Sequence, residues 1–238
     1  MNSTKELNYK LFAEMHVTET ENTVKGSNEQ FAKLNATGLS IDFDNGESIK
    51  FPNLTITNGE KILLMGDSGS GKSTLVKLLT GNLQPKSGSI NYINENGEVI
   101  NNPSSFFSYL PQDATLFPDT IANNITMFND HLLNQVPEIV QQVELDNDIH
   151  KFDAGLATKL DLDHMTLSGG QQQKVVLARA EVHNKPILFI DEGTSAIDRM
   201  GTKKILSRLL SSDLTIMFIA HNFDDELEGM FSRKVELK

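Results

Sequence analysis

The residues GDSGSGKST occupy Gly66–Thr74 and fit the pattern G-x-x-x-x-G-K-[ST], in which two glycines and a lysine stand at fixed spacing. An apolar run, Lys61–Met65, precedes this stretch, and apolar residues at helical spacing follow it within Leu75–Leu79. A strand, a glycine-rich loop and a helix in this order form the unit from which parallel α/β proteins are built. The sequence around the motif therefore predicts an α/β fold with a phosphate-binding loop.

The expected chemistry of this loop follows from its residue types. Glycines let the backbone curl so that successive N–H groups and the helix N-terminus point toward phosphate oxygens. Lys72 is expected to bridge the terminal phosphates, and the Ser73 hydroxyl to ligate Mg²⁺, a cation that prefers oxygen ligands. The alternative is an ordinary glycine-rich turn with an exposed lysine. The predicted phosphate-binding residues are Gly66, Ser68, Gly69, Gly71, Lys72, Ser73 and Thr74.

Two carboxylates and a histidine follow two other apolar runs. Ile187–Glu192, ILFIDE, is typical of a buried strand and ends in Asp191 and Glu192, and His221 follows the run Leu214–Ala220. In open α/β sheets, ligands bind at the carboxyl ends of the strands. We expect Asp191 to hold Mg²⁺, Glu192 to polarise an attacking water, and His221 to hydrogen-bond the terminal phosphate or that water. Taken alone, Asp-Glu or a histidine at the end of a strand is an ordinary feature. The predictions for Asp191, Glu192 and His221 therefore depend on the presence of the phosphate loop.

The composition limits the location and the partners of the chain. It has 238 residues, no cysteine and a formal net charge of -11. The absence of cysteine excludes disulfides and thiolate metal sites, and an acidic surface repels a phosphate backbone, so no nucleic-acid partner is expected. No apolar run approaches the ~20 residues of a membrane helix, and the N-terminus lacks the apolar stretch of a secretory signal. We expect an isolated domain that is soluble and cytoplasmic.

The remaining patterns divide the chain into a terminal segment and a longer α/β region. Residues 1–30 combine an amphipathic helical pattern with a polar linker. Short alternating runs predict strands at Phe31–Leu34, Leu39–Phe43, Ile49–Phe51 and Leu54–Ile56, with hairpin turns at Asp44–Glu47 and Asn58–Gly59. Helical patterns cover most of Thr120–Leu145, then Gly169–Val182 and Thr202–Leu210. A helical insert within an α/β core is the expected arrangement.

A further motif makes a family resemblance specific. Leu167–Lys174, LSGGQQQK, together with the phosphate loop, the Asp-Glu strand end and His221, resembles the ATP-binding cassette (ABC) family. The resemblance covers residues 31–238. It implies a RecA-like P-loop NTPase core with an antiparallel β subdomain and an inserted α-helical subdomain at about residues 113–168, and two cassettes paired head to tail around two ATP molecules. Residues 1–30 are then the connection from a transmembrane domain.

The resemblance also implies roles for further residues. Residues that cap or approach the γ-phosphate held by the other cassette are Ser168, Gly169, Gly170, Gln171 and Asp198. Hydroxyl and N–H groups at a helix N-terminus do form an anion site, although Ser-Gly-Gly also suits a plain helix cap. Gln112 is expected to contact Mg²⁺ or the attacking water. Phe43 is expected to stack on adenine, with a strand core position as the alternative.

The segment that follows Gln112, DATLFPDTIANNI, resembles ABC exporters, in which it faces the membrane domain. The resulting expectation is a nucleotide-binding domain that hydrolyses Mg-ATP to drive export, held at the cytoplasmic face of the membrane by a transmembrane domain. Two alternatives stay open: a soluble ABC ATPase acting on nucleic acid or ribosomes, and a nucleotide-gated module without turnover. The chain departs from the usual family pattern at Lys174 for arginine, Gly193 for alanine, Phe43 for tyrosine, and in the stretch Leu160–Thr166.

Overall fold

The computed structural model describes residues 30–43, 46–100, 103–164, 166–220 and 225–237. The chain divides into Met1–Gln30 and a compact unit, Phe31–Lys238. The amphipathic helix predicted within residues 1–30 lies outside the described residues, and so does His221. Within the described ranges, every helix is too short or too polar to span a bilayer.

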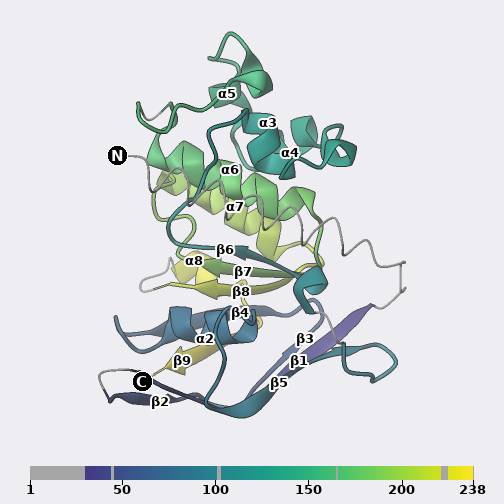
Figure 1. The fold of residues 1–238 in the computed structure, drawn as a ribbon, viewed down its shortest axis with the longest axis vertical. Coiled ribbons are helices and arrows are strands. Elements are labelled where there is room, and N and C mark those ends of the chain that lie inside the picture. Colours follow the sequence, from purple (N-terminus) through teal and green to yellow (C-terminus); the bar gives the residue numbers. More distant parts are fainter. Residues whose placement is uncertain (1–29, 44–45, 101–102, 165, 221–224, 238) are drawn as a thin grey trace. The chain divides into compact units, whose positions relative to one another are not determined.

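A five-stranded sheet, parallel throughout, lies at the centre of the unit (Figure 1). Its strands follow the order β6 (Phe107–Leu110), β7 (Ile187–Asp191), β8 (Thr215–Ile219), β4 (Lys61–Gly66) and β9 (Arg233–Leu237). The strands predicted from the runs that begin at Lys61, Ile187 and Leu214 are confirmed. Their runs are continuously apolar because helices and a second sheet bury both faces of a parallel sheet.

Helices connect these strands. They are α2 (Lys72–Leu79), α6 (Gly169–Val182), α7 (Arg199–Leu210) and the short α8 (Asp225–Glu228). Helix α6 has the predicted bounds. Helix α7 begins three residues before the predicted Thr202, because the Asp198 side chain accepts a hydrogen bond from Gly201 N (2.9 Å) and caps the helix there.

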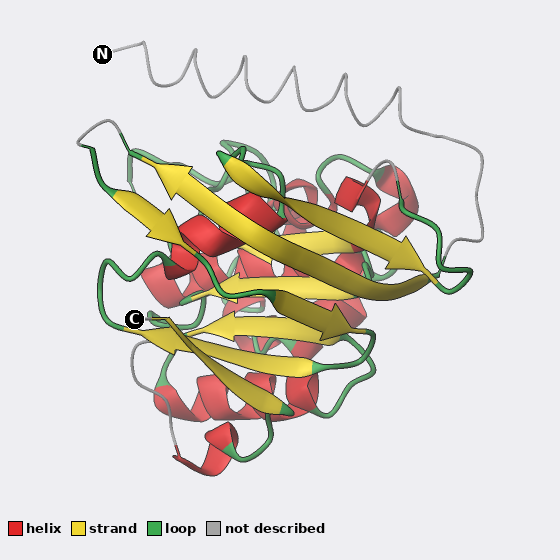
Figure 2. Cartoon of the chain, turned by 90° about the horizontal axis from the view of Figure 1, so that it is seen from below, coloured by secondary structure: helices red, strands yellow, loops and turns green. Residues whose placement is uncertain are grey.

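A second sheet is antiparallel and lies below the parallel sheet in Figure 1; Figure 2 shows it from its own side. Strand β1 (Phe31–Asp42) pairs with β2 (Ser48–Lys50), β3 (Leu54–Thr57) and β5 (Ser87–Asn94). Two predictions were wrong here. The runs Phe31–Leu34 and Leu39–Phe43 form one strand, with an irregular register between Thr37 and Ser40. Asn58–Gly59 turns the chain from one sheet into the other and makes no hairpin, since β3 pairs with β1 and β4 with β8 and β9.

Short helices fill the region between β6 and α6. They are α3 (Ile121–Thr126), α4 (Val136–Gln142) and α5 (Asp146–Ile149), with 3₁₀ turns at Asp130–Leu132 and Gly155–Ala157; another 3₁₀ turn, Pro103–Phe106, precedes β6. Pro137 lies in the first turn of α4, where its missing N–H costs no helical hydrogen bond. The helical insert predicted within Thr120–Leu145 is confirmed as separate short helices.

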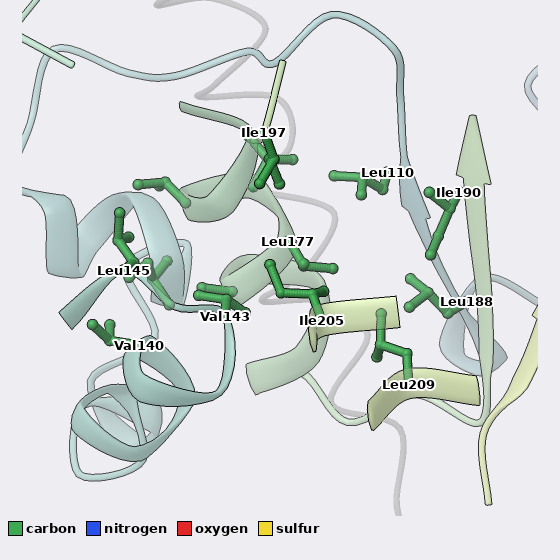
Figure 3. Packing of buried hydrophobic residues seen from close by; sticks show 14 of the residues in the cluster. Leu110, Val140, Val143, Leu145, Leu177, Leu188, Ile190, Ile197, Ile205 and Leu209 are labelled. Atoms are coloured by element: carbon green, nitrogen blue, oxygen red, sulfur yellow. The ribbon is translucent and has the colours of Figure 1, made fainter. Parts of the chain in front are cut away.

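The hydrophobic core consists of two clusters, one on each face of the parallel sheet. Alternate residues of β4 divide between them: Ile62 and Leu64 pack with α2 and the antiparallel sheet, whereas Leu63 belongs to the cluster of α6 and α7. Figure 3 shows the second cluster, which runs from Leu188 on the sheet through α6 and α7 to Val140 on α4. The short helices are therefore anchored by the core that supports the carboxyl ends of the strands.

Candidate nucleotide-binding site

The loop between β4 and α2 adopts a conformation that requires glycine. Gly66 and Gly71 have φ values of 152° and 91°, in the region that L side chains rarely adopt. A Cβ on Gly66 would lie 2.5 Å from the Leu237 carbonyl oxygen, so a side chain there would collide with β9. The glycines of the motif thus allow the tight curl that turns backbone N–H groups toward one point.

Lys72 is fixed across this loop. Its side chain is buried, and Nζ donates hydrogen bonds to the carbonyl oxygens of Gly66 and Asp67, each at 2.8 Å. A buried ammonium at the N-terminus of α2 makes the loop an anion site. Ser70 Oγ is buried and has no hydrogen-bond partner among the described residues.

A pocket of about 410 Å³ opens above the loop. The predicted residues that line it are Phe43, Ser68, Gly69, Gly71, Lys72, Ser73, Thr74, Gln112 and Glu192. Glu47 and Ile49 also line it; they were not predicted, because a turn residue and a short strand carry no chemical signal. Phe43 is 36% exposed, so its ring is a wall of the pocket, and the alternative of a strand core position is excluded.

The acidic strand end lies at the same edge of the sheet. Gln112 Nε2 donates to Glu192 Oε2 at 3.2 Å, which brings two predicted residues from different strands together. Asp191 is buried and accepts a hydrogen bond from the Tyr109 hydroxyl at 3.2 Å. Burial, and then the charge of Asp191, raises the pKa of Tyr109, so its hydroxyl stays protonated and remains a donor. Tyr109 was not predicted, because an aromatic residue within a strand usually belongs to the core.

The donors around the pocket fit Mg-ATP. The fixed lysine and the glycine-supported N–H groups suit phosphates, and Phe43 offers an aromatic face to a base. No group of three or more His, Cys, Asp or Glu side chains in the described ranges forms a metal site by itself. Mg²⁺ is usually held by one or two protein oxygens together with phosphates and water.

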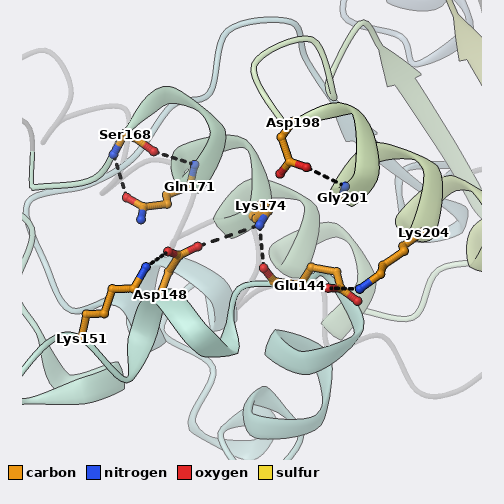
Figure 4. A network of polar contacts seen from close by, with 9 residues as sticks. All are labelled: Glu144, Asp148, Lys151, Ser168, Gln171, Lys174, Asp198, Gly201 and Lys204. Carbon is orange, nitrogen blue, oxygen red and sulfur yellow. Dashed lines mark hydrogen bonds and ion pairs between the residues drawn. The ribbon is translucent and has the colours of Figure 1, made fainter.

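The LSGGQQQK motif forms the start of α6, away from the pocket lining. Ser168 Oγ accepts a hydrogen bond from Gln171 N (3.3 Å), and Gln171 Oε1 accepts one from Ser168 N (2.9 Å), a reciprocal capping box (Figure 4). Gly170 has no room for a side chain, since a Cβ would lie 2.6 Å from the Ala196 carbonyl oxygen. Gly169 and Ser168 are exposed. The motif is therefore both a helix cap and an exposed N-terminus.

Asp198 is exposed and caps the start of α7 (Figure 4). The hydrogen bond from Gly201 N, and to a smaller degree the charge of Lys174, lowers the pKa of its carboxyl. Lys174 is buried and donates to the Glu144 carbonyl oxygen at 2.6 Å, with Asp148 Oδ2 at 3.9 Å. The lysine that stands for the usual arginine thus joins α6 to the chain around α5.

The structure brings most predicted residues into two groups. The phosphate loop, Phe43, Gln112 and Glu192 surround the pocket, and Asp191 is the last residue of β7, directly before Glu192. Ser168, Gly169, Gly170, Gln171 and Asp198 form a second group that does not line that pocket. His221 lies outside the described residues.

Comparisons with known proteins identify the family of this chain. The family described as ABC transporter matches residues 49–195. The Lactococcin transport/processing ATP-binding protein LcnC-like of Lactococcus lactis subsp. lactis (strain IL1403) is 39% identical over 194 residues, 79% of this chain and 27% of that protein. The ATP-dependent lipid A-core flippase of Aliivibrio fischeri (strain ATCC 700601 / ES114) is 34% identical over 211 residues, 86% of this chain and 35% of that protein. The chain thus spans about a third of these relatives or less.

A solved structure supports the fold. A bacterial Atm1-family ABC exporter with ATP bound superposes with a TM-score of 0.77, at 24% identity, over 97% of this chain and 43% of that one. The resemblance of the sequence to exporter-type ABC ATP-binding domains is confirmed by these matches. With its P-loop NTPase fold, its ATP-binding motifs and a family match over more than half of its length, this chain belongs to the ABC transporter family.

Proposed function

We propose that this chain is the Mg-ATP-hydrolysing domain that drives a membrane exporter. The observation that carries the proposal is the pocket in which Lys72, Gln112 and Glu192 meet above one phosphate loop. The relatives named as transport/processing protein and lipid A-core flippase support export, because 79% and 86% of this chain match a part of each of them. The part of such a protein that lies outside this chain would determine which substrate is transported.

In the proposed reaction, Lys72 and the N-terminus of α2 neutralise charge on the terminal phosphates. Glu192 polarises the attacking water, and Gln112, bonded to Glu192 at 3.2 Å, orients that carboxylate. Ser73 and Asp191 would hold Mg²⁺, with Gln112 in reach of it; when bound, the ion supplies charge stabilisation along the phosphate chain. His221 is proposed, from the resemblance alone, to hydrogen-bond the terminal phosphate.

Pairing of two cassettes head to tail completes the proposed site. Ser168 and Gly169 offer an exposed helix N-terminus that is not part of the chain's own pocket. Such an N-terminus attracts a phosphate through its N–H groups and dipole. We infer that Ser168–Gln171 and Asp198 serve the nucleotide of a partner cassette, which makes the domain a dimer in action.

The finer division of the fold belongs to the proposal as well. The parallel sheet with α2, α6 and α7 corresponds to a RecA-like core, the sheet around β1 to the antiparallel β subdomain, and residues of about 113–168 to the helical subdomain. The boundary proposed after residue 30 coincides with that of the compact unit. Residues 1–30 are proposed to lead to a transmembrane domain, which would hold the cassette at the cytoplasmic face of the membrane.

A surface for that membrane domain lies beside the segment after Gln112. Arg179 holds this segment on α6: its guanidinium donates to the carbonyl oxygens of Asn124 (2.8 Å) and Thr115 (3.1 Å) and lies 5.5 Å from the centre of the Phe117 ring. Burial lowers the pKa of Arg179 to about 10, so it remains charged at neutral pH. The segment thus offers a fixed surface for docking.

A groove of about 260 Å³ lies next to this surface. Leu116 and Leu160 contribute apolar walls, and Leu162, 38% exposed, adds an apolar rim. A helix or loop of a membrane partner fits such a groove by burying an apolar side chain. Contact through this groove would link the partner to the segment after Gln112 and to the LSGGQQQK motif, whose residues Ser168–Gln171 we call the signature residues, because Ala114 and Leu167 both line the groove.

Replacement of Glu192 by Gln tests the proposed chemistry. The change removes the carboxylate but keeps its shape, so ATP turnover is expected to fall by about 10²-fold or more. ATP binding, measured with a fluorescent nucleotide, should stay within about twofold, and Glu138→Gln on the exposed face of α4 serves as the matched control. If Glu192→Gln released phosphate at the wild-type rate, Glu192 would not be the residue that polarises the attacking water.

The alternative, an ABC ATPase that acts on nucleic acid or ribosomes, makes a different prediction. The net charge of -11 argues against it, because phosphate backbones bind basic surfaces. Filter binding of the chain to DNA, RNA and ribosomes at moderate salt separates the two functions. Tight, salt-sensitive binding would favour the alternative over export.

A further inference from the structure

Gln173, the third glutamine of LSGGQQQK, joins three segments of the chain through one buried carboxamide. Its side chain is 5% exposed. Oε1 accepts a hydrogen bond from Ala196 N at 2.8 Å, and Nε2 lies 3.2 Å from Ser195 Oγ and 3.5 Å from the Gln112 carbonyl oxygen. Helix α6, the loop after β7 and the segment after β6 therefore meet at this group.

The orientation of this carboxamide is determined by its partners. The Ala196 N–H can only donate, so it must face the oxygen of Gln173. The amide nitrogen then faces Ser195 Oγ and the Gln112 carbonyl, both of which can accept. Because the three partners fit only one orientation, Gln173 fixes the distance between its neighbouring segments.

These neighbours belong to the two groups of site residues. Gln112 lines the nucleotide pocket and bonds to Glu192. Ala196 abuts Gly170 of the helix start, where a Cβ would lie 2.6 Å from its carbonyl oxygen, and is followed closely by Asp198. A shift of Gln112 would therefore move the Gln173 side chain. Through that side chain it would also move Ala196 and the neighbouring residues that are proposed to face a partner cassette.

We propose that Gln173 is a positioning residue that couples a cassette's own nucleotide pocket to its Ser195–Asp198 loop and signature residues, which act on the partner's nucleotide. This inference rests on the proposed function, since it assumes nucleotide in the pocket and pairing of cassettes. Gln173 touches neither the nucleotide nor the water in this scheme. It transmits the state of one site to the surface that completes the other.

Hydrogen exchange of the full chain tests the coupling without relying on turnover. In the wild type, a non-hydrolysable ATP analogue is expected to slow amide exchange in residues 66–74, 112–116 and 194–198. In Gln173→Met, which keeps the volume and removes the hydrogen bonds, the response should persist in the first two segments and disappear in 194–198. Gln141→Met, at an exposed position of α4, should respond as the wild type does.

The outcomes separate the coupling from the proposed function. A wild type without any response in residues 66–74 overturns both. A normal wild-type response together with a preserved response of 194–198 in Gln173→Met overturns the coupling alone. Thermal unfolding of Gln173→Met is measured alongside hydrogen exchange. Loss of the exchange response in all three segments would indicate damage to the fold and contradict a positioning role.

A second variant gives a signature that packing alone does not produce. In Gln173→Glu the carboxyl can reproduce both ends of the amide only while protonated, because its O–H then donates and its carbonyl accepts. Turnover relative to wild type is therefore expected to fall as pH rises through the pKa of the introduced carboxyl, with the KM for ATP little changed. A ratio that does not vary with pH would contradict the proposal.

Discussion

Backbone geometry at Glu192 and Gly193 shows how single residues shape the site. Glu192 has a φ of 51°, in the left-handed region, which costs a non-glycine residue about 1 kcal/mol or more. At Gly193 a Cβ would lie 2.4 Å from Leu110 Cδ2 and 2.5 Å from its Cγ. The glycine that replaces the usual alanine thus lets Leu110 pack directly against the turn that carries the proposed catalytic carboxylate.

The change Gly193→Ala tests this packing. Because Leu110 is fully buried and leads through Pro111 to Gln112, we expect the added methyl group to destabilise the fold by about 1–3 kcal/mol and to lower ATP turnover. Denaturant unfolding of Gly193→Ala, Leu110→Ala and the double variant measures the effect. The double variant should be more stable than the sum of the single changes predicts, by about 1 kcal/mol; additive losses would show that the two residues do not compete for space.

At the scale of elements, the start of α6 depends on contacts with α5. Asp148 on α5 is near Lys151, Gln171 and Lys174 (Figure 4). Burial acts to raise the pKa of Asp148, but the hydrogen bonds from Lys151 and Gln171, with the charges of both lysines, lower it overall. The ionised carboxylate therefore stabilises the folded state and holds the short helices against the signature residues.

The variant Asp148→Asn should make this contribution visible in its pH dependence. A carboxyl whose folded pKa is below its unfolded value stabilises the protein above the unfolded pKa, and this stability is lost as pH falls through the folded pKa. We expect the free energy of unfolding of the wild type to exceed that of Asp148→Asn by about 1 kcal/mol near pH 7, and this difference to shrink as pH falls below the ordinary aspartate pKa of 3.8. Asp153→Asn, at an exposed position, is the control. A difference that does not change as pH is lowered until the carboxylate is protonated would assign the effect to packing.

At the scale of the whole molecule, the central question is how two chains share a site. If pairing is head to tail, a chain lacking its phosphate loop and a chain lacking its signature should complement each other. Lys72→Ala removes the first function. Ser168→Asp removes the second by adding a negative charge at the anion site, while aspartate still caps the helix.

Mixing the two variants checks this arrangement. Each alone should be inactive, whereas an equal mixture should recover up to about a quarter of the wild-type ATPase rate, because half of random pairs are mixed and each mixed pair has one complete site. The measurement is phosphate release against total chain concentration. A mixture no more active than its components would argue against a shared site.

The sequence predicted the elements whose chemistry is local. The phosphate loop, the apolar strands with their acidic end and α6 could be placed from residue types and spacing. It did not predict that β1 is one long strand, because the polar residues in its middle face solvent at an irregular register, as β1 passes between its partners. It also missed the role of Tyr109, whose hydroxyl finds Asp191 only when β6 and β7 are paired.

By itself, the sequence determined the ABC membership of this chain and predicted the groups that we propose to handle nucleotide, because motifs of fixed spacing impose their own local geometry. Only the tertiary structure decided which of those groups meet. Gln112 reaches Glu192, and Gln173 reaches Ser195, across 80 and 22 positions of sequence. Such contacts depend on strand order and helix packing, which arise from burial of both faces of the sheet and leave no trace in the spacing of the residues concerned.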